Sequence, residues 1–120
     1  MAIQLIETNG GRVLEVIASD KLTESDYQKF VPEFERLARL HGKMRVLYDM
    51  RDFHGWEAKG LWEDIKFDVK HFADFDRVAL VGDAQWQSWM ATACRPFLTG
   101  EVRHFESAQL TEARVWVEAP

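Results

Sequence analysis

The residues best suited to acid–base or metal chemistry are acidic and histidine side chains near the middle of the chain. Asp49, Asp52 and His54 follow an apolar run typical of a buried strand, and Asp83 follows the next such run. Binding and catalytic sites in open α/β sheets gather where parallel strands end, and a carboxylate beside a histidine can transfer protons or bind a metal. However, positions 26–87 hold no Ser or Thr, and no G-x-S-x-G turn supplies a nucleophile. We therefore expect no enzyme activity and keep catalysis by these residues only as a third hypothesis.

Other signatures of cofactor chemistry are missing from the sequence. Cys94 is the single cysteine, which excludes an intramolecular disulfide and a cysteine-based metal site. The histidines show no ligand spacing such as H-E-x-x-H, and the glycines form no phosphate-binding loop. We expect neither a cofactor nor a metal.

Aromatic residues are unusually frequent, with five Trp and eight Phe. Such rings fill the core of a small domain, but they also line pockets for apolar ligands. In a helix expected over residues 59–72, one apolar stripe should face the sheet, and it comprises Leu61, Trp62, Ile65, Val69 and Phe72. Phe67 falls on nearly the opposite side of this helix, and Trp56 precedes it. These two rings are either scattered surface residues or the border of a contact surface.

A further helix, expected over residues 84–98, carries a second broad apolar face. Trp86, Trp89, Met90 and Phe97 lie on this face, and they either fill the core or form one wall of a cavity whose other wall is the helix over residues 59–72. The hypothetical ligand-binding set joins both helices. It consists of Trp56, Leu61, Trp62, Ile65, Phe67, Trp86, Trp89, Met90 and Phe97.

Charge and hydropathy narrow the range of partners. The net charge of −5 disfavours nucleic acid, and it also disfavours electrostatic attachment to anionic lipid. No apolar run approaches the roughly 20 residues needed to span a bilayer, so membrane contact would be peripheral at most. The N-terminal residues lack the basic and apolar regions of a secretory signal, and we expect a cytoplasmic protein.

The predicted elements alternate between strands and helices. Strands are expected over residues 3–7, 12–18, 44–50, 77–81 and 101–105, with a hairpin turn at Asn9-Gly10-Gly11 and a loop over residues 51–58. A helix capped by Thr23 should run to Gly42, with Pro32 kinking or splitting it, and Ser107 should cap a last helix ending near Glu118. The order ββαβαβαβα predicts a mixed, mostly parallel five-stranded sheet with about four helices.

The strands also predict that the two faces of this sheet differ. Glu15, Arg45 and Arg103 each interrupt an otherwise apolar strand. A sheet covered equally on both faces would consist of nearly unbroken apolar residues. One face should therefore be better covered than the other.

The element order and two segments, LTESDYQKFVPEFERLARLHGKMRVLYDM and WQSWMATACRPFLTGEVRHF, resemble the SpoIIAA-like family. The resemblance covers nearly the whole chain and implies one domain, residues 1–120, with the fold of STAS domains. It also implies kinship with CRAL-TRIO lipid-carrier domains, and hence apolar ligand binding and membrane association. Antagonists of the sporulation type are switched by phosphorylation of a Ser at the start of the helix after the third strand. Residues 49–60, the matching stretch, contain no Ser, Thr or Tyr, so this phospho-switch does not carry over.

Our leading hypothesis is a non-catalytic binding or regulatory module with a lipid-like or other apolar ligand between the two aromatic helices. The alternative is a protein–protein interaction module, either a homodimer or a partner-switching regulator of STAS type without the phospho-Ser switch. Both hypotheses rely on the same exposed aromatic residues.

Overall fold

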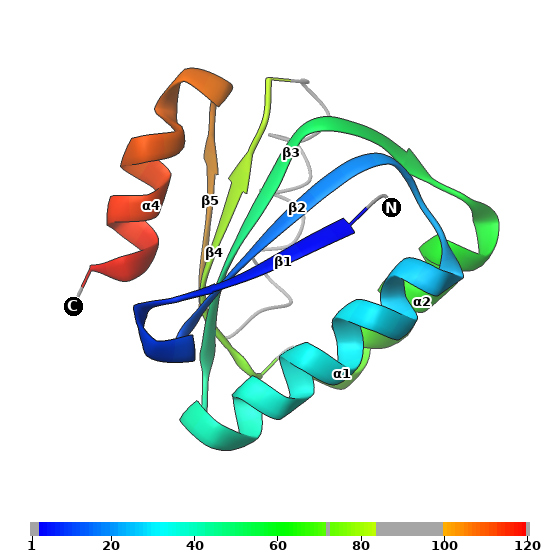
Figure 1. The fold of residues 1–120 in the computed structure, drawn as a ribbon, viewed down its shortest axis with the longest axis horizontal. Coiled ribbons are helices and arrows are strands. Elements are labelled where there is room, and N and C mark those ends of the chain that lie inside the picture. The colour runs from blue at the N-terminus through cyan, green and yellow to red at the C-terminus, as the bar shows by residue number, and fades with distance from the viewer. Residues whose placement is uncertain (1–2, 72, 84–99, 120) are drawn as a thin grey trace.

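The computed structural model describes residues 3–71, 73–83 and 100–119, which form one five-stranded sheet with helices on both faces (Figure 1). The strands are β1 (Ile3–Thr8), β2 (Val13–Leu22), β3 (Met44–Trp56), β4 (Phe75–Val81) and β5 (Glu101–Phe105). The helices are α1 (Glu24–His41), α2 (Ala58–His71) and α4 (Leu110–Glu118), with short 3₁₀ turns at Asn9–Gly11 and Ser107–Gln109. The helix predicted over residues 84–98 lies outside the described residues. The spatial strand order is β1-β2-β3-β4-β5, antiparallel between β1 and β2 and parallel elsewhere, which confirms the predicted mixed sheet.

The hairpin between β1 and β2 forms where the sequence predicts it. Asn9, Gly10 and Gly11 all have positive φ, at 53°, 70° and 88°. Gly11 is also constrained by space, because a Cβ atom built there would lie 2.9 Å from Nε2 of His41. The turn therefore depends on glycine for backbone freedom at Gly10 and for both freedom and space at Gly11.

Helix α1 begins as predicted but is not split by Pro32. Thr23 caps it reciprocally: the Asp26 backbone N–H donates to Oγ1 of Thr23, and the Thr23 backbone N–H donates to Asp26 Oδ2 at 2.8 Å. The helix then runs as one element through Pro32 to His41, so the prediction of a split at Pro32 is wrong. Pro32 faces solvent, where water can bind the carbonyl that loses its partner, while Phe30 and Phe34 keep the inner face packed.

Strand β3 is longer than predicted. The expected loop over residues 51–58 is wrong in its first part, because β3 continues to Trp56 and pairs with an equally extended β2. The pairing contains register shifts between Ile17 and Ser19 and between Asp20 and Leu22, and Asp20 has a positive φ of 52°. These irregularities break the alternation of apolar and polar residues by which a strand is recognised in a sequence.

The two faces of the sheet carry different cores. α1 and α2 cover the first face, where the main cluster includes Leu14, Val46 and Val78. Among the described helices, only α4 lies on the second face, over a smaller cluster that includes Leu47 and Phe105. Glu15, Arg45 and Arg103, which interrupt the apolar runs, lie on this second face, where each contacts α4.

The C-terminal segment follows the prediction except at its cap. Ser107 opens a 3₁₀ turn rather than capping the helix: its backbone N–H donates to Oδ1 of Asp83 at 2.7 Å, and Oε1 of Gln109 accepts from the Glu106 N–H at 2.9 Å. Helix α4 then ends at Glu118, as expected. Asp83 thus joins the end of β4 to the start of the last helix.

The hairpin offers a matched pair of stability tests. Gly10→Ala should cost about 1–2 kcal/mol of unfolding free energy, because an L-residue resists positive φ. Gly11→Ala should cost more, because its new Cβ also meets His41. Urea unfolding of both variants measures the difference, and equal losses would contradict the close approach of α1 to the turn.

Candidate functional site: the outer face of the second helix

Helix α2 is the element on which the predicted ligand site depends, and its start is fixed against β2. The Glu57 backbone N–H donates to the carbonyl oxygen of Leu22 at 2.9 Å. A Cβ atom built at Gly60 would lie only 2.3 Å from that same oxygen. Glycine therefore allows the first turn of α2 to lie directly on the end of β2.

Phe67 points inward from α2, which corrects the prediction that it lies on the outer side. It is only 4% exposed, and its ring centroid lies 5.0 Å from those of Phe30 and Phe34 and 6.0 Å from that of Phe75. Phe67 therefore belongs to the core between the two helices and the sheet, and it leaves the candidate ligand-binding set.

Polar contacts between α1 and α2 explain this error. The hydroxyl of Tyr27 donates to Oδ1 of Asp64 at 2.8 Å, and Nζ of Lys70 lies 3.2 Å from Oε1 of Glu35. The face of α2 that meets α1 therefore includes charged residues as well as Phe67. Because this buried face carries charged residues, its sequence pattern resembles that of a solvent-facing surface.

Trp62 is exposed, which corrects the prediction that this ring faces the sheet. Trp62 and Phe67 are five positions apart in the sequence, which places the two side chains roughly 140° apart around the helix. With Phe67 directed inward, Trp62 is directed outward, and its side chain is 60% exposed. We call the side of α2 on which Trp62 lies the outer face of α2. A large apolar ring is thus exposed on this outer face.

The other predicted ligand-binding residues are not placed by the described part of the structure. For Trp56, Leu61 and Ile65 the backbone is described, within β3 and α2, but the side chains are not. The remaining four lie outside the described residues, and they are Trp86, Trp89, Met90 and Phe97. Their role in a binding surface stays a prediction.

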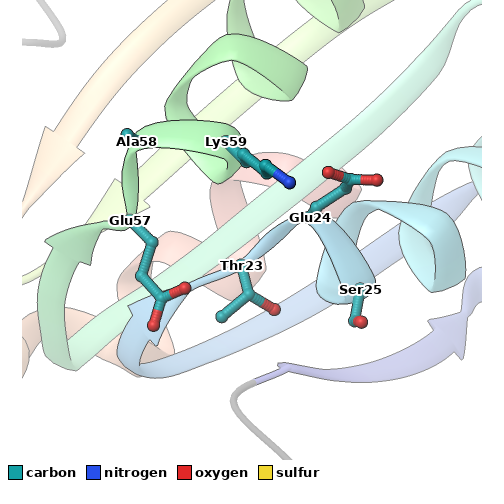
Figure 2. Close-up of a pocket in the computed structure, with 6 residues that line it drawn as sticks. All are labelled: Thr23, Glu24, Ser25, Glu57, Ala58 and Lys59. Carbon is teal, nitrogen blue, oxygen red and sulfur yellow. The ribbon is translucent and has the colours of Figure 1, made fainter.

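A polar pocket that sequence reasoning missed lies between the starts of α1 and α2 (Figure 2). It is open to solvent, has a volume of about 470 Å³, and is lined by Thr23, Glu24, Ser25, Glu57, Ala58 and Lys59. Figure 2 shows the Lys59 amine directed toward the side of Glu24. The two carboxylates make this pocket unsuited to anions, although two helices begin beside it. Its only signal in the sequence is that both helices start where adjacent parallel strands end.

The acidic and histidine residues of the third hypothesis are not gathered into one group. Asp49 is buried and paired with Arg51, whereas Asp52 and His54 are exposed. Asp83 accepts the backbone N–H of Ser107, and this bond lowers the pKa of Asp83 below its ordinary value. Within the described part of the chain, no three His, Cys, Asp or Glu side chains are arranged to hold a metal ion.

Together these features define a class of protein: a small α/β domain built on a mixed, mostly parallel sheet. The SpoIIAA-like family matches the chain over residues 13–118. The chain belongs to the SpoIIAA-like family, and its fold is STAS-like, as the sequence resemblance implies.

A solved structure supports the same assignment. An uncharacterized protein of the DUF3478 family from Shewanella loihica PV-4, described as having a SpoIIAA-like fold, is similar with a TM-score of 0.78 and 28% identity. The match covers 97% of this chain and 92% of that one. No curated protein matches the sequence. None of the described helices is long and apolar enough to cross a membrane.

The orientation of α2 can be tested with two aromatic substitutions on the same helix. Phe67→Ala should lower the free energy of unfolding by about 3–5 kcal/mol, because it empties a packed site. Trp62→Ala should change it by only about 0.5 kcal/mol, because the ring is mostly in solvent. Urea unfolding measures both, and the reverse ranking would restore the orientation expected from the apolar stripe.

Proposed function

We propose that this domain is a non-catalytic binding or regulatory module that holds an apolar or lipid-like ligand against the outer face of α2. The observation that carries the proposal is the 60% exposure of Trp62 on a helix whose inner face is already filled by Phe67. In this proposal the segment over residues 84–98 supplies the other wall, and association with membranes is peripheral.

The physical argument concerns the cost of leaving tryptophan in water. A Trp ring has a large apolar area with one N–H donor, and it contributes most when a partner covers its face. Trp62 adds nothing comparable to the domain's own core, because Phe30, Phe34 and Phe75 are packed by Phe67 instead. A ring at this position is therefore better explained by contact with another molecule than by folding.

The alternative partner is a protein. Trp62 would also suit a homodimer contact, or the docking surface of a STAS-type regulator that works without a phosphorylated Ser. The two proposals differ in one respect: a ligand leaves the protein monomeric, whereas self-association doubles its mass.

The ligand proposal is tested with a fluorescent fatty acid whose anisotropy rises on binding. Trp62→Ala should weaken binding about tenfold, because a buried aromatic face at a contact contributes on the order of 1–3 kcal/mol. Leu40→Ala is the matched control, since Leu40 is 65% exposed on the neighbouring helix α1, and it should bind like the unaltered protein. Absence of saturable binding, or equal weakening by both substitutions, would count against an apolar site on α2.

Light scattering distinguishes the protein–protein alternative from the ligand proposal. The substitution to use is Trp62→Asp, because Trp62 lies on the exposed outer face of α2. A charge introduced at Phe67 would be uninformative, because Phe67 is buried and the change would disturb the core. A dimer that becomes a monomer on Trp62→Asp would support self-association through α2 and contradict the ligand proposal.

A further inference from the structure

Two carboxylates are buried on the second face of the sheet, the face opposite α1 and α2. Glu15 on β2 is 5% exposed and Asp49 on β3 is 2% exposed. The parallel pairing places Glu15 beside Leu47 and Ile17 beside Asp49, so the two acids are diagonal neighbours on adjacent strands. An ionised carboxylate is costly to bury unless a cation pairs with it.

Each buried acid has an arginine partner, and the two arginines lie on different elements. Arg51 of β3 holds Asp49 with two parallel bonds, Nε to Oδ1 at 2.8 Å and Nη2 to Oδ2 at 2.7 Å. Arg114 of α4 donates from Nη2 to Oε1 of Glu15 at 2.8 Å. The hydrogen bond to its own acid is the main cause that raises the pKa of each arginine. The four groups also act on one another, since Asp49 further raises the pKa of Arg114 and Glu15 further raises that of Arg51. They form one cluster, and we call Arg51 and Arg114 within it the arginine pair.

Stability alone does not explain this cluster. Replacing a buried ion pair with apolar residues is often neutral or stabilising, because desolvation offsets the attraction. What the buried acids do is fix the two guanidinium groups, whose side chains remain 44% (Arg51) and 48% (Arg114) exposed. A guanidinium group carries more N–H donors than one carboxylate accepts, so each arginine still presents donors to solvent.

The surroundings suit a ligand with an anionic group and an apolar part. Asp49 pairs with Val81, the last residue of β4, so it lies level with the carboxyl end of that strand. Ligands of open α/β sheets commonly bind at the carboxyl ends of the strands. Ile6 on β1 pairs directly with Glu15, lies on the same face and is exposed. Fixed guanidinium groups match the geometry of phosphate oxygens.

We propose that Arg51 and Arg114, held in place by Asp49 and Glu15, form a binding site for the phosphate group of a small amphipathic ligand, with Ile6 against its apolar part. The site is separate from the outer face of α2 and stands whether or not Trp62 binds an apolar ligand. Asp52 lies beside Arg51 as an exposed acid and lowers the affinity of the site.

Inorganic phosphate is the probe, and amide chemical shifts of β3 and α4 are the readout. Saturable shifts in the millimolar range are expected, and Arg51→Lys and Arg114→Lys should each weaken binding about tenfold, because lysine keeps the charge but not the planar donors. Asp52→Asn should tighten binding, since it removes a like charge from the ligand's surroundings. Arg36→Lys is the matched control, because Arg36 is paired with Glu7 and Glu33 on the other face of the sheet, and it should change nothing.

The fold of each variant is checked by thermal unfolding. Arg51→Lys leaves the contact between α4 and β2 intact, so it tests the site even if Arg114→Lys loosens the helix. A folded protein without saturable shifts, or an equal loss in Arg36→Lys, would overturn the proposal. Sedimentation with phosphatidylcholine vesicles, with and without phosphatidic acid, then identifies the source: arginine-dependent sedimentation assigns the phosphate to a lipid headgroup, and its absence assigns it to a soluble ligand.

Discussion

The contact on which the rest of the first layer depends is the packing of Phe67 against Phe34. Their ring centroids lie 5.0 Å apart, and Phe30 and Phe75 enclose them from α1 and from the sheet. Aromatic rings packed edge to face have few alternative arrangements, so this contact fixes the rotation of α2 about its own axis. Once that rotation is set, the outward position of Trp62 follows from helix geometry alone.

The second face is held together in a different way. Two arginines of the strands form hydrogen bonds with the C-terminal end of α4. Arg77 donates to the backbone carbonyls of Trp116 and Ala119, and Arg45 donates to those of Val117 and Ala119. Cations at this position satisfy carbonyls that the helix itself leaves unpaired and complement its dipole. Arg77 and Arg103 also lie over the ring of Trp116. Helix α4 is thus anchored to the strands by hydrogen bonds and ring contacts.

Much of the fold could be predicted from local signals in the sequence. The hairpin at Gly10, the cap at Thr23 and the strand over residues 101–105 each depend on neighbours in the chain, and each was found. The extension of β3 was missed because its pairing with β2 passes through register shifts, which erase the alternation of side chains. Such shifts arise between strands, and a single strand's sequence does not record them.

The candidate site was predicted less well, for a related reason. An apolar stripe predicts the buried face of a helix that packs only against a sheet, but α2 also packs on α1, through Tyr27 and Asp64 as well as through Phe67. The arginine pair was missed because Glu15 and Arg114 are far apart in the chain and meet only after α4 folds onto β2. Of the acidic residues singled out at first, Asp49 does have a defined environment, although its partner is an arginine and not a histidine.

The close approach at Gly60 constrains how α2 could ever move. With the Leu22 carbonyl oxygen 2.3 Å from where a side chain would begin, the first turn already lies against β2 and cannot sink further toward it. Any displacement that opens the layer must therefore pivot about this end, with the largest excursion at the opposite end near His71. The space between α1 and α2 would widen there first, along the line where Lys70 meets Glu35, and breaking that exposed ion pair would cost little.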